Sequence, residues 1–586
     1  MKVAHLTTVD LSLRYLVFAQ LESIREMGGE SIGISAPGPW VEEIEAAGIT
    51  HVPLPASTRG IAPLADLKAA WQLWKILRDD PPDILHTHNP KPGLYGRILG
   101  RLAGVPVVIN TVHGLYAAPD DPPVKKAVVY VLEAIAARFS DLELVQSRED
   151  LALMERLHMV RPGQGQLLGN GVDLVKFDPD RTDLPGRAAM RAELGVSDDQ
   201  IVVGMVGRLV AEKGYPELFE AAAELQDNYV VVAIGPDDPD KPDALPREVV
   251  ESAEQAGVRF LGMRTDVDAL YQALDVFVLP SHREGFPRAA MEAAAMGLPI
   301  IATDIRGCRE VVDDGINGVL IPVRSPNLLK AAIERVGSDA EARQRMGSAS
   351  WRKAQLAFDE QMVVHRVLEA YRTVTAEKGL TAMGEALGSG SGVAELRAAV
   401  AADAAALARM HIEGIGTGFL PRLGPRFMRL LYVALIGYDE AVVLVADSGG
   451  GAIGFVAGVA DTGAFYKHFA RRHGVGAAIR ALPAAMRPSN LRRGWETARY
   501  GGGDEDVRAE LLSMAVDTAW RGKGIALRLG RTFLAELAAR EVDSVKVVVG
   551  MRNEVAQRAY QRMGFVEAGT EEVHPGETSM VLVWSA

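Results

Sequence analysis

The feature that most constrains this chain's fold is a regular alternation of short β-branched segments with helical segments rich in Ala, Leu and Glu, from Met1 to about Pro322. This alternation predicts parallel sheets covered by helices on both faces. The pattern gives two series of candidate strands, namely Lys2–Leu6, Ser31–Ser35, Ile84–His86, Val105–Asn110 and Leu142–Gln146, then Ile201–Val206, Tyr229–Ile234, Val258–Phe260, Val276–Leu279 and Ile300–Ala302. Between them, Asp178–Asp199 is rich in Pro, Asp and Arg, which indicates a connection between two doubly wound domains with a ligand cleft between them.

Composition excludes several classes of protein. The chain has 586 residues, 48% apolar and 24% charged, so it is long enough for several cores and is typical of soluble globular proteins. Its net charge of −13 argues against a nucleic-acid partner. The single cysteine, Cys308, excludes a disulfide framework and a thiolate-rich metal site, and it suits a reducing compartment.

No targeting signal is expected. The chain begins MKVAHLTTVD, without a basic-then-apolar leader, and its apolar stretches are far shorter than the ~20 residues that a membrane-spanning helix needs. We therefore expect a cytoplasmic protein, either free or peripheral at the inner face of the cell membrane.

The pattern changes in the last third of the chain. A helical segment at Trp351–Thr373 precedes Glu377–Gly392, whose sequence GEALGSGSG predicts a flexible linker because it offers no apolar face to bury. A mixed α/β domain is expected after it, with candidate elements at Val393–Val400, Asp403–His411, Val442–Ala446, Ala452–Ala460, Glu510–Val516, Leu527–Arg540, Val545–Val549 and Ser579–Trp584.

Two acids and two bases follow candidate strands of the second series. Glu284 and Glu292 lie in SHREGFPRAAMEAAAMGLP, and Arg208 and Lys213 lie in VGRLVAEKG. Ligands of open parallel sheets bind at the carboxyl ends of the strands, where two cations neutralise a pyrophosphate and carboxylates accept hydrogen bonds from hydroxyls. The set favours a nucleotide-sugar ligand that is held without a metal.

In order along the chain, these motifs resemble those of the family-4 retaining glycosyltransferases with the GT-B fold. The matching segments are the E-x7-E of Glu284 and Glu292, GRLVAEKG, GNGVDLVKFDP, FLGMRTDV and GCREVVDDGINGVLIP. The resemblance implies that Arg208 and Lys213 bind the donor pyrophosphate, that Glu292 binds the ribose and that Glu284 meets the transferred sugar. The donor is expected to be a UDP-sugar.

The same resemblance assigns three further residues. Gly262 and Arg264 fall where the family meets the nucleotide base, and His113, in INTVHGLY, faces the donor phosphate or sugar. A neutral His113 would form a hydrogen bond there, and a protonated one would add charge stabilisation. With no protein nucleophile in evidence, the leaving phosphate itself would deprotonate the acceptor. One departure from the family is the loop TTVDLSLRY, which replaces a paired glycine after the first strand.

HTHNPKPGLYGR and TVHGLY resemble family members that act on polyprenyl-diphosphate-linked sugars. His86 and His88 of this segment are interpreted as structural. Five basic residues either face lipid phosphates or form an ordinary solvated surface, and they are Lys91, Arg97, Arg101, Lys125 and Lys126.

A second motif set lies near the C-terminus. RGKGIA joins a strand to a helix with two glycines that let backbone N–H groups approach a pyrophosphate, and VVVGMRNEVAQRAYQRMGF follows. Together they resemble the GNAT acetyltransferase superfamily over Val393–Trp584. The resemblance implies acetyl-CoA as co-substrate, Tyr560 as the acid that protonates the CoA thiolate and Glu510 as the base. The implied cofactor-binding residues are Val516, Arg521, Gly522, Lys523, Gly524, Ala526 and Asn553.

The sequence therefore predicts an α/β protein with a GT-B fold of two Rossmann-like domains followed by a mixed α/β GNAT domain. The predicted boundaries are 1–185, 186–376, a linker at 377–392 and 393–586. The expected protein is a bifunctional enzyme that transfers a sugar with retention and N-acetylates an amine, on an amino-sugar or a lipid-linked glycan. Two alternatives stay open, a soluble small-molecule sugar acceptor and a GNAT domain that only binds acetyl-CoA.

Overall fold

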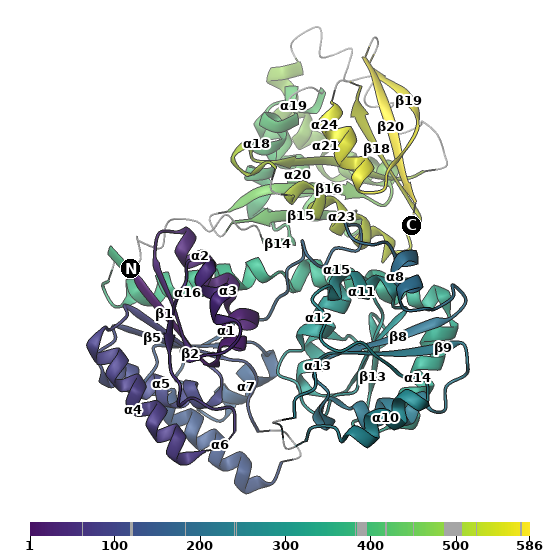
Figure 1. The fold of residues 1–586 in the computed structure, drawn as a ribbon. Helices are drawn as coiled ribbons and strands as arrows, with labels where there is room; N and C mark the ends of the chain where they lie inside the picture. Colours follow the sequence, from purple (N-terminus) through teal and green to yellow (C-terminus); the bar gives the residue numbers. More distant parts are fainter. Residues whose placement is uncertain are drawn as a thin grey trace. The chain divides into compact units, whose positions relative to one another are not determined.

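The computed structural model describes residues 1–60, 62–117, 121–181, 183–239, 241, 243–380, 382–383, 395–415, 419–448, 451–485, 507–522, 524–551, 553–574 and 577–585. It divides into two compact units, Met1–Ser391 and Gly392–Ala586 (Figure 1). Most of the predicted linker lies outside the described residues, and the finer predicted boundaries stay predictions.

The first sheet of unit 1 has seven parallel strands in the order β3-β2-β1-β4-β5-β6-β7. Its strands are β1 (Lys2–Val9), β2 (Glu30–Ala36), β3 (Thr50–Pro53), β4 (Ile84–His88), β5 (Val107–Val112), β6 (Leu142–Val145) and β7 (Gly165–Leu167). The helices that alternate with them are α1 (Asp10–Leu16), α2 (Phe18–Glu26), α3 (Val41–Ala46), α4 (Pro63–Asp79), α5 (Pro90–Leu102), α6 (Pro123–Ala136) and α7 (Arg148–Arg156). β3 and β7 were not predicted, because both are short strands at the edges of the sheet.

The second sheet has six parallel strands in the order β10-β9-β8-β11-β12-β13. They are β8 (Ile201–Val206), β9 (Tyr229–Ile234), β10 (Arg259–Phe260), β11 (Val276–Leu279), β12 (Ile300–Thr303) and β13 (Gly318–Ile321). Its helices are α8 (Arg187–Glu193), α9 (Tyr215–Ala222), α10 (Arg247–Gln255), α11 (Val267–Ala273), α12 (Arg288–Ala295), α13 (Arg306–Val311), α14 (Pro326–Ser338) and α15 (Ala340–Ala357). Residues 230–234 of β9 are all buried, which explains its unbroken apolar sequence, since a sheet covered on both faces has no polar side.

The predicted helix at Trp351–Thr373 is broken. α15 ends at Ala357 and α16 (Glu360–Glu377) begins after Asp359, whose carboxylate accepts a hydrogen bond from Gln361 N. Phe358 packs in the core of the second sheet, whereas apolar residues of α16 pack in the core of the first. The break therefore carries the chain back onto the first sheet and joins the two halves of unit 1.

Unit 2 is built on one mixed sheet, in the order β14-β15-β16-β17-β18-β20-β19. Its strands are β14 (Glu395–Ala398), β15 (Ala441–Asp447), β16 (Ala452–Val459), β17 (Ala509–Val516), β18 (Ser544–Gly550), β19 (Val566–His574) and β20 (Glu577–Ser585). Its α-helices are α18 (Ala404–Ile415), α19 (Phe419–Arg422), α20 (Pro425–Ile436), α21 (Thr462–Ala485), α23 (Ile525–Ala538) and α24 (Glu554–Arg562).

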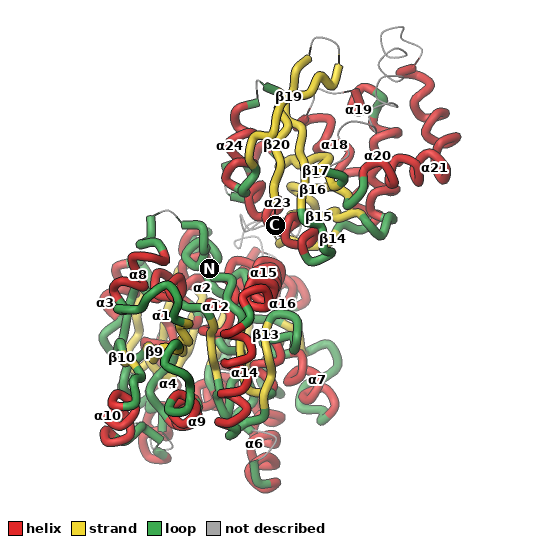
Figure 2. Tube along the Cα trace, turned by 90° about the vertical axis from the view of Figure 1, so that its right-hand side faces the viewer, coloured by secondary structure: helices red, strands yellow, loops and turns green. Residues whose placement is uncertain are grey.

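Alternate residues of β15 face different cores. Val442 and Leu444 pack with α23, whereas Val443 and Val445 pack with α18 and α20. This period of two places helices on both faces of the sheet, as Figure 2 shows. Among the described residues, we find no helix that combines the length and apolarity needed to cross a bilayer.

Candidate active sites

Unit 1 contains a cavity of about 430 Å³. Three of the polar side chains that line it lie in loops at the carboxyl ends of strands. His113 is in the loop after β5, Arg208 in the loop after β8 and Glu284 in the loop after β11. Further polar side chains that line it are Tyr15, Gln20, Gln146, Asn170, Arg288 and Glu360. The structure thus brings together three of the predicted site residues that are far apart in the sequence.

Two glycines allow the loops on either side of the cavity to touch. A Cβ atom on Gly285 would lie 1.9 Å from the His113 carbonyl oxygen, and one on Gly114 would lie 2.6 Å from Gly285 Cα. Gly114 also has a φ of 115°, which side chains disfavour. This backbone contact holds His113 next to the loop that carries Glu284.

Two hydrogen bonds hold the carboxylate of Glu284 in place in the cavity. Its Oε1 accepts hydrogen bonds from Lys213 Nζ at 2.6 Å and Ser281 Oγ at 2.8 Å. Lys213 therefore neutralises Glu284, while Arg208 forms an ion pair with Asp238. Of the two predicted phosphate-binding cations, Arg208 lines the cavity and Lys213 acts on it through Glu284.

Glu292 lies on α12, one turn after Arg288, which lines the cavity. Its carboxylate accepts hydrogen bonds from Tyr271 OH at 3.2 Å and from Arg288 Nε at 3.1 Å. Burial raises the pKa of Glu292 above its usual range, and Arg288 opposes that shift. Each carboxylate oxygen still has a lone pair for a ligand hydroxyl.

The two residues predicted to meet the base do not line the cavity. Gly262 has a φ of 64° and its carbonyl accepts from Gly235 N, whereas Arg264 forms ion pairs with Asp266 and Glu193 at 2.7 and 2.8 Å.

The His113 ring is neutral near pH 7. Burial lowers its pKa to about 4, although a hydrogen bond with Gln146 opposes this shift. Its Nε2 lies 3.0 Å from His88 Nδ1. Of the two forms considered from the sequence, the structure favours the hydrogen-bonding neutral ring over the charged one.

The unusual loop after β1 runs straight into α1. The buried Asp10 carboxylate accepts hydrogen bonds from the backbone N–H groups of Leu11 and Trp40, both at 2.8 Å. These contacts fix the loop beside Tyr15, which lines the cavity.

Neither interpretation of Arg97 from the sequence, as a residue facing lipid phosphates or as part of a solvated surface, is correct. Its side chain is 1% exposed and forms ion pairs with Glu133 and Glu143 at 2.6 and 2.8 Å. Lys91 and Arg101 likewise pair with acids, Asp66 and Asp141. A sequence of scattered bases does not reveal which of them have buried partners.

In unit 2, β17 and β18 part after a short contact. Their register consists of Ala509 with Val545 and Glu510 with Lys546, although both strands continue. Glu510, which is 7% exposed, accepts a hydrogen bond from Thr462 Oγ1 at 3.1 Å. Burial raises its pKa, which suits a base, and the nearby Lys546 opposes the shift.

The predicted cofactor loop has the expected backbone. Gly522 and Gly524 have φ values of 81° and 76°, and Gly524 caps α23, which contains Ala526. The Arg521 side chain bonds the Val516 carbonyl at 3.0 Å, whereas Lys523 lies outside the described residues.

The two residues of the last motif have different environments. Asn553 caps α24, where its Oδ1 accepts from Ala556 N at 3.2 Å. Tyr560 is 7% exposed, and burial raises its pKa, so its hydroxyl is protonated at neutral pH.

A buried group of hydrogen-bonded polar side chains in unit 2 was not predicted from the sequence. Tyr432 OH lies 2.6 Å from His411 Nδ1 and 2.9 Å from Ser513 Oγ on β17. Burial lowers the pKa of His411 to about 4. No motif marks these residues, because they come from three separate elements.

Comparison with protein families matches three parts of the chain. Residues 24–171 match the glycosyl transferase 4-like domain, residues 186–352 match the glycosyl transferases group 1 family and residues 419–565 match the acetyltransferase (GNAT) family.

Several curated proteins and solved structures are similar to unit 1. The UDP-Gal:alpha-D-GlcNAc-diphosphoundecaprenol alpha-1,3-galactosyltransferase of Escherichia coli is 33% identical over 293 residues, which is 49% of this chain and 74% of that enzyme. The N,N'-diacetylbacillosaminyl-diphospho-undecaprenol alpha-1,3-N-acetylgalactosaminyltransferase of Campylobacter jejuni is 24% identical, over 64% of this chain and 99% of that enzyme. Sucrose-phosphate synthase from Thermosynechococcus elongatus has the same fold, with a TM-score of 0.56 and 22% identity over 64% of this chain and 100% of that one.

The predicted GT-B fold is therefore confirmed, and the chain belongs to the group 1 glycosyltransferase family, with a GNAT-family acetyltransferase domain at its C-terminal end.

Proposed function

We propose that this chain is a bifunctional enzyme of glycan assembly. Unit 1 transfers a sugar from a UDP-sugar to a polyprenyl-diphosphate-linked acceptor with retention, and unit 2 N-acetylates an amino-sugar with acetyl-CoA. The observation that carries the first activity is the cavity in which His113, Arg208 and Glu284 meet.

Each of these groups suits a step of sugar transfer. Arg208 neutralises the donor diphosphate as negative charge develops on the leaving group. Neutral His113 supplies a hydrogen bond, and Glu284, held by Lys213 and Ser281, accepts hydrogen bonds from sugar hydroxyls. The bond from the sugar C1 to the phosphate oxygen breaks, a bond from C1 to the acceptor oxygen forms on the same face, and the acceptor's proton passes to the leaving phosphate.

The names of two relatives support the acceptor class. The Escherichia coli and Campylobacter jejuni enzymes act on sugars linked to diphosphoundecaprenol. A soluble acceptor is the second candidate, because D-inositol 3-phosphate glycosyltransferase of Kribbella flavida is 30% identical over 50% of this chain and 72% of that enzyme.

An exposed apolar stripe on α6 favours the lipid-linked acceptor. It consists of residues spaced as one helix face, namely Val124, Val128, Val131, Leu132 and Ile135, with exposures from 42% to 75%. The opposite side of α6 faces the protein, because Glu133 pairs with Arg97. An apolar helix face of this kind binds in the interface of a bilayer, where the diphosphate-sugar head of a polyprenyl-linked acceptor is presented.

Vesicle binding tests this surface. The wild-type chain is expected to cosediment with vesicles that contain anionic lipid, and the double variant Val128→Glu/Val131→Glu is expected to lose binding. Val249→Glu, at an exposed valine of α10 in the other half of unit 1, is the matched control and should bind as wild type does. Equal binding by all three proteins, or none by the wild type, would count against a membrane-bound acceptor.

Unit 2 has groups suited to acetyl transfer. Glu510, through water, takes a proton from the acceptor ammonium, and the amine nitrogen then attacks the acetyl carbonyl carbon. The C–S bond breaks and Tyr560 protonates the departing thiolate. When bound, acetyl-CoA supplies the acetyl group, with its pyrophosphate on the amides at the start of α23.

Product analysis tests both activities. Mass spectrometry and anomeric NMR of the product formed from UDP-sugars and polyprenyl-diphosphate-sugars test unit 1, and release of free CoA in the presence of amino-sugars tests unit 2. Glu284→Gln is expected to abolish the first reaction only, and Tyr560→Phe the second only. CoA binding without acetyl transfer by the wild type would instead support a binding domain.

A further inference from the structure

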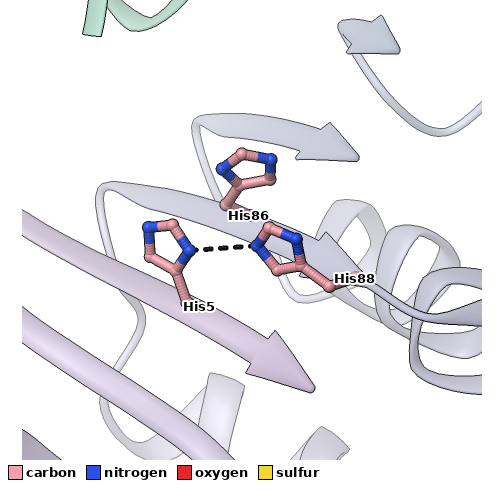
Figure 3. Close-up of side chains that lie close together, drawn as sticks. All are labelled: His5, His86 and His88. Atoms are coloured by element: carbon pink, nitrogen blue, oxygen red, sulfur yellow. Dashed lines mark hydrogen bonds between the residues drawn. The ribbon is translucent and has the colours of Figure 1, made fainter. Parts of the chain in front are cut away.

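A chain of hydrogen bonds connects the buried centre of the first sheet with His113. It contains His5 on β1, His86 and His88 on β4, Thr111 on β5 and Tyr371 on α16, all at most 2% exposed. Figure 3 shows His5 facing His86 and His88 across the two neighbouring strands, which pair in register at His5 and His86.

The links are continuous. They join Thr111 Oγ1 to His86 Nε2 at 2.7 Å, His86 Nδ1 to Tyr371 OH at 2.7 Å, Tyr371 OH to His5 Nε2 at 3.2 Å, His5 Nδ1 to His88 Nε2 at 3.0 Å and His88 Nδ1 to His113 Nε2 at 3.0 Å.

Because burial lowers the pKa of every ring in the chain, each imidazole is neutral and carries one hydrogen. A neutral imidazole donates from one nitrogen and accepts at the other. The links therefore either run in one direction from end to end or reverse at Tyr371, whose hydroxyl can accept from both His86 and His5.

The hydroxyl hydrogens of Thr111 and Tyr371 distinguish these arrangements. In the first, Thr111 donates to His86, each group donates to the next, and His113 accepts at Nε2, so its hydrogen is on Nδ1. When every link is reversed, Thr111 accepts, and its own hydrogen has no acceptor among the described residues. When the links reverse at Tyr371, that hydroxyl accepts twice, and its hydrogen likewise has no acceptor among the described residues. A buried donor without an acceptor is costly, so the first arrangement is favoured by roughly tenfold or more.

We propose that His88, His5, Tyr371, His86 and Thr111 are positioning residues that hold His113 in the tautomer with its hydrogen on Nδ1. This nitrogen, which His88 does not contact, then donates to an oxygen of the donor in place of Gln146, which also lines the cavity and is hydrogen-bonded to the His113 ring. The role in catalysis rests on the proposed function of unit 1, whereas the tautomer itself does not.

The same cluster has the composition of a metal site. Ligand atoms of His5, His86 and His88 lie within 4.8 Å of one another. However, all six ring nitrogens already have protein partners, so a bound ion would have to break several of these hydrogen bonds. The hydrogen-bonded chain is the arrangement that the geometry favours.

The first test reads the tautomer directly. The full chain is labelled with [15N]histidine, and long-range 1H–15N spectra are recorded at pH 7.5, with His113→Gln used for assignment. The expected result is one His113 tautomer protonated at Nδ1. Protonation at Nε2, equal populations of both tautomers, or one tightly bound zinc ion per chain would overturn the proposal.

The second test reverses the direction of the hydrogen bonds by a substitution that does not touch His113. In His5→Asp, a carboxylate near the position of Nδ1 can only accept, so His88 must donate from Nε2 and His113 must carry its hydrogen on Nε2. We expect this tautomer, with kcat for sugar transfer at least about tenfold lower and KM for the UDP-sugar within about threefold. His5→Asn, which can donate or accept, should restore most of the loss.

Equal kcat and an unchanged His113 tautomer in a folded His5→Asp protein would refute the proposal. Tyr229→Phe, which removes a partly buried hydroxyl that donates to the Glu334 carbonyl in the other half of unit 1, is the control for loss of a hydrogen bond away from the cluster. If His5→Asp does not fold, the wild-type spectrum decides. If the wild type transfers no sugar, the proposed function fails while the tautomer result stands.

Discussion

Acidification from pH 7.5 to 5.5 should destabilise unit 1 through its buried histidines. His5, His86 and His88 are 0% exposed. Burial lowers the pKa of His5 from 6.5 to about 3, and those of His86 and His88 well below 6.5. Below pH 6.5 the unfolded chain binds protons that the folded chain does not, so the stability falls as the pH falls towards the folded pKa values.

The magnitude follows from the number of rings. Each such ring titrates at pKa 6.5 in the unfolded chain and stays neutral in the folded chain. Between pH 7.5 and 5.5 it lowers the free energy of unfolding by about 1.4 kcal/mol, because protonation stabilises the unfolded state about tenfold over this interval. Three such rings together lower the free energy of unfolding by ~4 kcal/mol, which is a large part of the stability of an ordinary domain.

Urea unfolding at the two pH values, on wild type and on His5→Asn, isolates this effect. Titrating groups that do not contact His5 contribute equally to both proteins, so the difference between their pH-induced losses measures His5 together with its coupling to His86 and His88. The variant is expected to lose ~1.4 kcal/mol less than wild type. An equal loss in both proteins would refute the reasoning, since His5 would then be protonated in the folded chain or not be buried.

Three further predictions concern other sites. Arg97→Met leaves the buried Glu143 carboxylate without its cation and should lower the unfolding free energy by about 3–5 kcal/mol in urea, whereas Arg97→Met/Glu143→Gln should recover part of the loss. Gly285→Ala places a methyl group against the His113 carbonyl and should reduce kcat for sugar transfer by about tenfold or more while acetyl transfer is unchanged; normal sugar transfer would mean that the two loops are not held together. Tyr560→Phe should leave acetyl-CoA affinity within about twofold in calorimetry but lower acetyl transfer by ~100-fold, and full activity would remove Tyr560 as the acid.

Much of the fold could be predicted from the sequence, because parallel strands that are buried on both faces have unbroken apolar sequences. β8 and β9 have the predicted bounds, Ile201–Val206 and Tyr229–Ile234. Edge strands such as β3 were missed, since Thr50–Pro53 is short and half-buried. The break at Phe358 was also missed, because the residues on both sides of it favour helix and only packing against two cores separates them.

The sites were predictable where a motif carries the chemistry. His113, Arg208 and Glu284 were found from local patterns, and they meet because each follows the carboxyl end of a parallel strand. The roles of buried polar residues were not predictable in the same way. Arg97 was misinterpreted, and the link from Tyr371 to His86 joins side chains separated by 285 positions. Such pairings depend on which elements the fold brings together.

Mass spectrometry of a single reaction tests the central claim most directly. The full chain is incubated with a UDP-sugar panel, acetyl-CoA and a polyprenyl-diphosphate-linked amino-sugar, and Glu284→Gln and Tyr560→Phe are run in parallel. The account predicts one acceptor that gains both a sugar and an acetyl mass, with each variant removing one of the two. Binding of UDP and CoA without either mass gain on any acceptor of this class would contradict it.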